Sequence, residues 1–277
     1  MEIRGKYLIH NLEVTPTEGY NLVQQPGELT LYEVFRIIDR VPLFLEDHLS
    51  RFDHSARLAG VTLPFPIDQV RLSVYELIRI NRFLNANIKL IACYAAGQTP
   101  YFTAYFVEHQ YPTPALFRRG VDTITLRAVR YNPNAKIFNT PLRSETNELK
   151  SRLNIYEVLL VDEGNRVTEG SRSNFFAISR KQVFTPPLSE VLPGVTRRHV
   201  LEACAKLGLV IVEKSILVPE LSDFDAVFLT GTSRKILPIR KIDNITFAVD
   251  NIIMRNLMAA FTETVTDYLR RHKHTNP

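Results

Sequence analysis

The sequence predicts an α+β protein of two domains, and three observations carry this prediction. The chain has 277 residues, 45% of them hydrophobic, which suffices for large apolar cores without metals or disulfides. Strand-like and helix-like segments are mixed along it, with no internal repeat. Pro112 and Pro114 interrupt this pattern. We therefore expect a small N-terminal domain at 1–112, a linker at 113–119 and a larger C-terminal domain at 120–277.

The N-terminal part is expected to combine a sheet with two helices. Residues 29–38 are rich in β-branched and aromatic side chains, and a two-residue break separates them from 41–45, which predicts a hairpin. Apolar residues then recur every three or four positions from Leu49 to Ala59, as in an amphipathic helix. The other elements expected here are a helix at 67–84 and strands at 88–95 and 101–107.

The C-terminal part begins with a predicted strand at 121–129. The polar stretch that follows, up to Lys150, is too long to be an idle connection. Apolar residues then recur in a helical pattern, which predicts a helix from Lys150 to Gly164. The other elements expected are helices from about 195 to 208 and from 253 to 269, and strands at 166–168, 174–178, 182–184, 209–212 and 225–229.

Charge and cysteine content exclude several classes of protein. The formal net charge is 34 − 29 = +5, but the charges of both signs are interspersed, so we expect anionic small molecules and no nucleic acid. Cys93 and Cys204 lie in apolar segments, which favours reduced, buried thiols and a cytoplasmic protein. No apolar run approaches the roughly 18–20 residues that span a bilayer, and the first residues lack a signal peptide's apolar region.

Several common site motifs do not occur in the sequence. The seven histidines are scattered, with no Cys-x-x-Cys or His-Glu-x-x-His pattern, so no metal site is expected. A Walker loop, a Gly-x-Gly-x-x-Gly turn and a Gly-x-Ser-x-Gly elbow do not occur either. Because these motifs do not occur, the best candidates for a binding site are the junctions between secondary-structure elements.

Two junctions carry groups that suit a phosphate. One is the start of a helix, where unpaired backbone N–H groups favour an anion, although its threonine can equally be an ordinary cap. The other follows a strand and offers hydroxyls beside a glycine that permits close approach, although it can equally be a plain turn. The residues concerned are Gly194, Val195 and Thr196 in the first junction and Gly231, Thr232 and Ser233 in the second.

Lys150 and Glu169, which precede both junctions in the sequence, can carry catalytic chemistry. A lysine whose amine is desolvated or near other cations can act as a Schiff-base nucleophile, whereas the plain alternative for Lys150 is a solvated charge. Glu169 follows Val167-Thr168 in a turn-like segment. Its carboxylate can keep a pyridine nitrogen protonated, and the plain alternative is a turn acid.

Six blocks in this order resemble the class IV, or fold type IV, pyridoxal-phosphate enzymes. This family includes branched-chain and D-amino-acid aminotransferases and 4-amino-4-deoxychorismate lyase. The order and spacing of the blocks make the resemblance specific. They are LYEVFRI, LEDHLSRFDHSA, NELKSRLN, VTEGSRSNFFAI, LPGVTR and FLTGTS, from about residue 31 to residue 233.

The resemblance implies the D-amino-acid aminotransferase-like fold, pyridoxal 5'-phosphate as cofactor and a homodimer with the active site near the interface. By its motif, Lys150 matches the lysine that binds the cofactor covalently and moves the substrate's α-proton. Glu169 matches the acid at the pyridine nitrogen. Arg51 matches the arginine on the phosphate, which the two junctions also bind, and Tyr32 matches a tyrosine on the substrate side.

The chain departs from the family where the substrate carboxylate would bind. The arginine and histidine of D-amino-acid aminotransferases have no counterpart in ACYAAGQTPYFTAYF, and Ile155 occupies the position of a branched-chain enzyme's tyrosine. We expect Arg143 and Arg172 to hold the carboxylate instead, since a guanidinium pairs with it through two bonds. The alternative is that both are surface charges.

The expected function is an aminotransferase with ping-pong kinetics that acts on a small amino acid, branched-chain ones included, and a 2-oxo acid. Two alternatives stay open. A 4-amino-4-deoxychorismate lyase would use the same cofactor and release pyruvate without an acceptor. A non-catalytic cofactor-binding protein would not need Lys150, Glu169 and Arg51 together.

Overall fold

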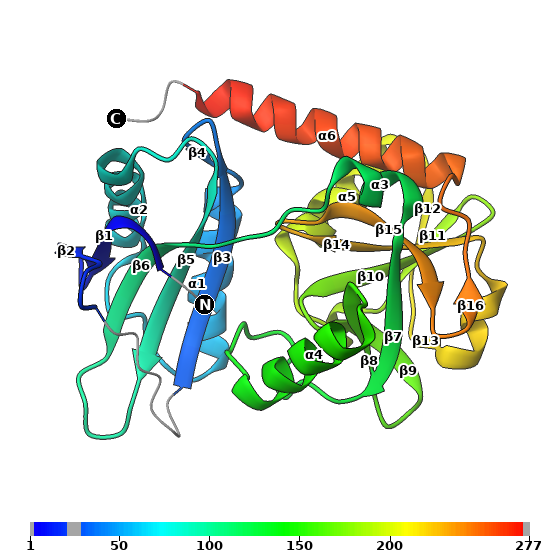
Figure 1. Cartoon of the computed structure of the whole chain (residues 1–277), viewed down its shortest axis with the longest axis horizontal. Helices are drawn as coiled ribbons and strands as arrows, with labels where there is room; N and C mark the ends of the chain where they lie inside the picture. Colours follow the sequence, from blue (N-terminus) through cyan, green and yellow to red (C-terminus); the bar gives the residue numbers. More distant parts are fainter. Residues whose placement is uncertain (1–2, 21–28, 274–277) are drawn as a thin grey trace. The chain divides into compact units, whose positions relative to one another are not determined.

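The chain forms two compact units in the computed structural model (Figure 1). Unit 1 comprises Met1–Gln110, Ala135–Phe138 and Thr266–Pro277, and unit 2 comprises Tyr111–Asn134 and Asn139–Val265. The structure describes residues 3–20 and 29–273. None of the helices in these described ranges is both long enough and apolar enough to cross a membrane.

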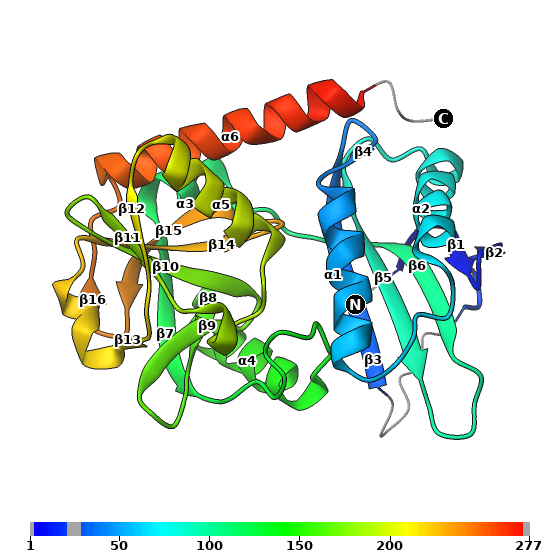
Figure 2. The same cartoon turned by 180° about the vertical axis from the view of Figure 1, so that it is seen from behind.

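Unit 1 is an antiparallel sheet with strand order β2-β1-β6-β5-β3-β4 and two helices on one face (Figure 1, and from behind in Figure 2). Leu31, Phe35 and Ile37 alternate along β3 and pack in the core beneath the helices. The elements are β1 (Ile3–His10), β2 (Glu13–Pro16), β3 (Leu29–Ile38), β4 (Val41–Pro42), α1 (Leu45–Leu58), α2 (Ile67–Asn81), β5 (Ala86–Tyr94) and β6 (Tyr101–Val107).

Most of the elements predicted for this part are confirmed. The hairpin pairs Ile38 with Val41, and the strand at 101–107 is β6. Strands β1 and β2 were not predicted, because polar and apolar residues alternate in them too irregularly to give a clear period.

Unit 2 is built around a closed barrel of six strands. The pairings run in a circuit, β10-β14-β15-β7-β8-β9 and back to β10, and further strands extend it. The barrel strands are β7 (Val121–Arg127), β8 (Glu157–Val161), β9 (Arg166–Gly170), β10 (Ser173–Ser179), β14 (Ala226–Gly231) and β15 (Lys235–Ile242). The others are β11 (Gln182–Thr185), β12 (Val210–Glu213), β13 (Ile216–Leu217) and β16 (Ile245–Thr246).

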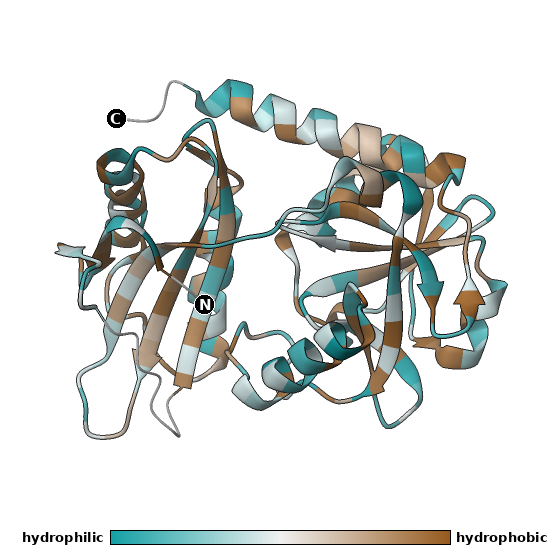
Figure 3. Cartoon of the chain, in the orientation of Figure 1, coloured by the Kyte–Doolittle hydropathy of each residue, from teal (hydrophilic) through white to brown (hydrophobic). Residues whose placement is uncertain are grey.

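Alternating side chains give the barrel a filled interior and a covered exterior. All six barrel strands contribute to one buried cluster, in which Leu159 and Phe175 are fully buried. The neighbouring Phe176 points outward and stacks on Phe228 with ring centroids 5.0 Å apart. The helices are α3 (Pro114–Arg119), α4 (Thr140–Leu153), α5 (Val195–Lys206) and α6 (Ile252–His272); hydrophilic and hydrophobic residues alternate in bands along α6 (Figure 3).

A β-bulge in β9 changes the direction of its last side chains. Val161 pairs with Val167 and Leu159 pairs with Gly170, so three residue steps on β9 face two on β8. Val167 belongs to the interior cluster, and Gly170 pairs with Ser173 on the same inner side. The bulge therefore turns Glu169 to the outside of the barrel.

One prediction for this part is wrong. The helix expected from Lys150 to Gly164 lies earlier, because Asn154 ends α4 in the left-handed conformation at φ 50°. The apolar run from Val158 to Val161 is buried throughout and forms β8, since such a run suits a core strand as well as a helix. Within the predicted linker at 113–119 the structure has the helix α3, whose N-cap is Thr113, and the role of this segment as a linker stays a prediction.

Candidate functional site

Glu169 lies on the outer face of the barrel in a shell of donors. It is buried, and Leu192 N–H donates to its Oε2 at 3.2 Å. The Asn174 amide donates to the same oxygen at 3.4 Å, and the Arg130 guanidinium forms an ion pair with Oε1 at 3.0 Å. Donors on both oxygens stabilise the ionised carboxylate, which is the form that a protonated ring nitrogen requires.

The two predicted phosphate junctions converge on Asn174, next to Glu169. Thr230, at the end of β14, pairs directly with Asn174. Gly194, at the start of α5, lies so close that a Cβ atom there would overlap the Asn174 side-chain oxygen. Any larger residue at this position would have to displace the Asn174 side chain, and α5 covers this outer side of the barrel in Figure 2.

These junctions suit an anionic group such as a phosphate. No side chain caps the start of α5, where the first backbone N–H groups point out of the helix. Thr196 in its first turn and Thr232 and Ser233 after β14 add hydroxyls. Together with Glu169, this donor set fits a phosphorylated pyridine.

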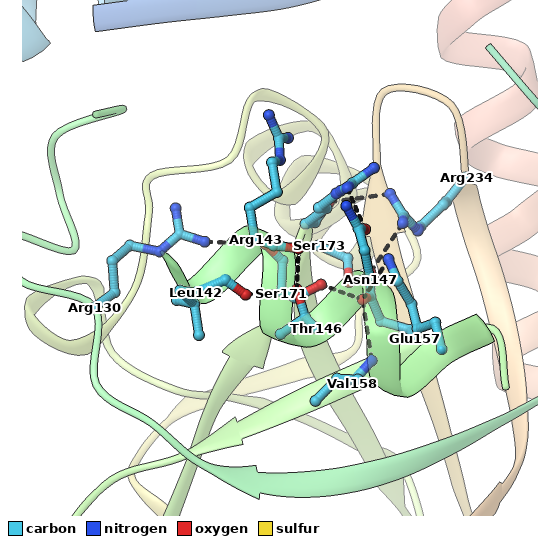
Figure 4. A network of polar contacts seen from close by, with 12 residues as sticks. Arg130, Leu142, Arg143, Thr146, Asn147, Glu157, Val158, Ser171, Ser173 and Arg234 are labelled. Carbon is cyan, nitrogen blue, oxygen red and sulfur yellow. Dashed lines mark hydrogen bonds and ion pairs between the residues drawn. The ribbon is translucent and has the colours of Figure 1, made fainter. Parts of the chain in front are cut away.

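Lys150 lies elsewhere, at the mouth of the barrel interior. Its Nζ is 3.9 Å from Oε1 of Glu157, the first residue of β8, which is fully buried. Glu157 also accepts from the Ser171 and Ser173 hydroxyls, at 2.6 Å and 3.2 Å, and forms an ion pair with Arg234 at 2.9 Å (Figure 4). Lys150 is therefore part of a buried network centred on one carboxylate.

The surroundings of Lys150 lower the pKa of its amine to about 8. Burial is the main cause, and the positive charges of Arg172, Arg234 and Arg143 lower the pKa further. The Glu157 carboxylate acts in the opposite direction. A substantial fraction of the amine is thus neutral under mildly alkaline conditions.

The structure does not bring Lys150 and Glu169 together. Lys150 contacts Glu157, which lies on the inner face of the barrel next to Ser173 and Gly170. Glu169 shares the outer face with Asn174. Strands β9 and β10 separate the two groups, so a ring that contacts Glu169 from outside would meet the barrel before it reached Lys150.

The two arginines predicted for the substrate carboxylate lie near Lys150. Arg172 is exposed in the turn between β9 and β10, and its guanidinium donates to the Asn147 side-chain oxygen at 2.5 Å. Arg143 is half-buried on α4 (Figure 4). Both lie within electrostatic range of the Lys150 amine, so their predicted role depends on a ligand at the barrel mouth.

Unit 1 holds Arg51 in a buried ion pair. Its Nε and Nη2 donate to the two oxygens of Glu33 at 2.7 Å and 2.8 Å, and His48 bonds the same carboxylate at 2.9 Å. Burial alone would raise the pKa of Glu33, but Arg51 and His48 outweigh it and the pKa falls to about 2. Glu33 thus fixes the Arg51 side chain, whose role toward a phosphate stays a prediction.

Tyr32 lies among lysines that the sequence reasoning missed. Lys136 Nζ is 4.5 Å from the centroid of the Tyr32 ring, and the Lys136 carbonyl accepts from the Tyr32 N–H at 3.1 Å. Lys89, in the middle of β5, is buried between Tyr32 and Phe138, 5.6 Å and 4.8 Å from their ring centroids. A charge inside an apolar strand is the signal that could have indicated Lys89, and Lys136 lies in the same polar stretch as Lys150.

Comparison with known proteins decides the family. The family described as "Amino-transferase class IV" matches residues 30–242. The chain belongs to the class IV aminotransferases. It is thus an enzyme of the transaminase type, as the motifs implied.

Individual relatives fall in different branches of this family. The chain is 30% identical to the D-alanine aminotransferase of Bacillus licheniformis over 224 residues, which cover 77% of this chain and 78% of the relative. Among solved structures, the branched-chain aminotransferase of the archaeon Thermoproteus uzoniensis with norvaline has a TM-score of 0.86 at 23% identity, covering 96% of this chain and 98% of that one. A putative 4-amino-4-deoxychorismate lyase from Legionella pneumophila has a TM-score of 0.76 at 23% identity, covering 84% of this chain and 90% of that one. The two structural matches establish the shared fold type IV architecture.

Proposed function

We propose that this enzyme uses pyridoxal phosphate to exchange an amino group between a small amino acid and a 2-oxo acid. The observation that carries the proposal is the outer face of the barrel, where Glu169 lies beside two anion-binding junctions that meet at Asn174. When bound, the cofactor supplies a pyridinium ring that delocalises the charge left by removal of the substrate's α-proton.

Each residue group has a distinct role in this proposal. Glu169 keeps the ring nitrogen protonated, because Asn174, Leu192 and Arg130 stabilise its negative charge. The start of α5 and the hydroxyls of Thr196, Thr232 and Ser233 bind the phosphate, together with Arg51. The Glu33 carboxylate fixes the Arg51 guanidinium before any ligand arrives.

We propose that Lys136, rather than Lys150, binds the cofactor covalently and carries the proton. Lys136 is adjacent to Tyr32, and its charge lowers the pKa of the buried His48, after burial itself and Arg51. Asn134, two residues before Lys136, donates to the carbonyls of Leu188 and Val191. Leu192, which follows Val191, donates its N–H to the Glu169 carboxylate. Lys136 is therefore only two residues along the chain from Asn134, which is hydrogen-bonded to the segment that contacts Glu169.

The substrate carboxylate has two candidate binding groups. The ammonium group of Lys89 lies beside Tyr32, and such a point charge suits a carboxylate. Arg143 and Arg172 remain the alternative that the sequence suggested. Michaelis constants for the amino donor in Lys89→Met and Arg172→Ala distinguish them, because the group that binds the carboxylate raises this constant when it is lost.

The lysine assignment is tested by trapping the bound cofactor. The protein is incubated with pyridoxal phosphate, reduced with borohydride and digested, and mass spectrometry locates the modified lysine. We expect modification of Lys136, its loss in Lys136→Ala and its retention in Lys150→Met. Modification of Lys150 alone would overturn the assignment to Lys136, and a protein that never binds pyridoxal phosphate would overturn the proposed function.

The reaction type is tested with the loaded enzyme. Alanine of either configuration and branched-chain amino acids are offered with and without a 2-oxo acid, and parallel initial-rate lines indicate ping-pong transfer. Pyruvate formed from 4-amino-4-deoxychorismate without an acceptor would indicate the lyase instead.

A further inference from the structure

The four-residue turn between β14 and β15 carries two of the proposed phosphate ligands. Arg234 N–H donates to the Gly231 carbonyl at 3.1 Å, which closes the turn, and Gly231 pairs with Lys235 across it. Thr232 and Ser233 are therefore the two central residues. The direction of their hydroxyls and N–H groups depends on how the turn is held.

The Arg234 side chain anchors this turn to the barrel interior. Its Nη2 is 2.9 Å from Glu157 Oε2, and its Nη1 donates to the Arg172 carbonyl at 3.1 Å. The guanidinium also lies 5.5 Å from the centroid of the Tyr156 ring. Only 15% of the side chain is exposed. A planar group held at several points fixes one orientation better than a flexible ammonium does.

Glu157 retains other partners if Arg234 is lost. Its oxygens accept from Ser171, Ser173 and the N–H of Val158, and Lys150 supplies a second positive charge. A substitution of Arg234 therefore leaves no uncompensated carboxylate, whereas a neutral residue at 157 would leave two buried cations without their anion. The barrel is thus expected to fold without Arg234, and the turn is the part that loosens.

We propose that the buried Glu157–Arg234 pair is a positioning device that presets the β14–β15 turn for the cofactor phosphate. Arg234 acts from the inner side of the barrel wall and does not itself bind the ligand. This inference rests on the proposed function, because Thr232 and Ser233 must be phosphate ligands for it to hold. Loss of the pair should weaken binding of the phosphate moiety specifically.

The test compares Arg234→Met with Arg240→Met. Arg240 lies on the same strand β15 and forms a two-bond ion pair with Asp122 at 2.6 Å and 2.9 Å, but more than half of its side chain is exposed. Dissociation constants are measured by absorbance titration for pyridoxal phosphate and for pyridoxal, and by competition for inorganic phosphate.

We expect Arg234→Met to weaken pyridoxal phosphate and inorganic phosphate by about tenfold, or about 1.4 kcal/mol. Pyridoxal should bind as it does to the unmodified enzyme, and Arg240→Met should change none of the three constants. Arg234→Lys should restore only part of the phosphate affinity, because it keeps the charge but loses the planar group.

The outcomes separate the two proposals. Unchanged phosphate affinity in Arg234→Met overturns the positioning role, and so does an equal loss for pyridoxal, which would indicate general loosening. An unmodified enzyme that binds neither phosphate nor pyridoxal phosphate overturns the proposed function itself. If Arg234→Met does not fold, by circular dichroism, the same three constants for Arg234→Lys decide between these outcomes.

Discussion

Ser173 and Asn174 are consecutive on β10, yet their side chains support carboxylates on opposite sides of the barrel wall. The Ser173 hydroxyl donates to Glu157 on the inner side at 3.2 Å, and the Asn174 amide donates to Glu169 on the outer side at 3.4 Å. One strand thus supports both the buried network at the mouth and the proposed ring-binding acid.

The inner network predicts a reactive amine at Lys150. Its pKa of about 8 lies below the ordinary value of 10.5, chiefly through burial. Between these values the unfolded chain binds the extra proton, so the contribution of Lys150 to stability rises as pH increases from about 8 to 10.5. Competitive acetylation with mass spectrometry should give a midpoint near 8. Arg172→Ala should raise this midpoint, because a nearby positive charge is removed; an unshifted midpoint would contradict the assigned cause.

The Glu33–Arg51 pair predicts a strong stability effect in unit 1. Glu33→Gln leaves Arg51 buried without its carboxylate and should cost about 3–5 kcal/mol in urea unfolding. Glu76→Gln is the matched control, because Glu76 also holds an arginine by two bonds but does so on the surface. The control should lose at most about 1 kcal/mol.

The same pair predicts how acid destabilises the fold. The pKa of Glu33 is lowered from 4.5 to about 2, so its contribution is complete above 4.5 and disappears as pH falls toward 2. Unfolding free energies measured across this range should fall less steeply in Glu33→Gln than in the unmodified protein. Parallel slopes would show that Glu33 is not the group responsible.

The close approach at Gly194 predicts that alanine is not tolerated there. A Cβ at this position would overlap the Asn174 side-chain oxygen, so Gly194→Ala should cost about 1–3 kcal/mol and weaken cofactor binding. Thermal unfolding checks the first effect. Adding Asn174→Ala removes the clashing oxygen, so the double variant should lose less stability than the sum of the single variants. Strict additivity would count against the contact.

Burial predicts an inert thiol at Cys204. The side chain is fully buried on α5, and burial raises the pKa of its thiol to about 12. A disulfide reagent should therefore react with Cys204 only after denaturant unfolds unit 2. Fast labelling of the native protein would contradict this.

Much of the fold could be predicted because, in many segments, the apolar residues recur with one dominant period, either that of a strand or that of a helix. The strand at 101–107 and the helix from 67 satisfied a single pattern each. The region from 150 to 164 did not, because an apolar run of four residues suits either a helix face or a core strand. The closure of the barrel depends on pairing between β9 and β10 and on register, which local patterns do not encode.

The candidate site shows the same division. Glu169 and the two junctions could be found from their motifs, and the structure places them together around Asn174. The motifs alone could not indicate which lysine binds the cofactor, since Lys136 and Lys150 lie in one polar stretch. That Lys150 and Glu169 are on opposite faces of the barrel wall follows only from the structure. Lys89 required knowledge of which rings surround it.

The β-bulge in β9 determines on which side of the barrel wall the proposed ring-binding acid, Glu169, lies. If β9 kept regular alternation beyond Val167 instead of forming the bulge, Glu169, two residues further along, would point like Val167 into the apolar barrel interior. A change of register alone would then remove an acid from the outer face of the barrel wall and bury a charge in the interior, with every side chain still present. In this part of the chain, spacing therefore constrains function as strictly as residue identity does.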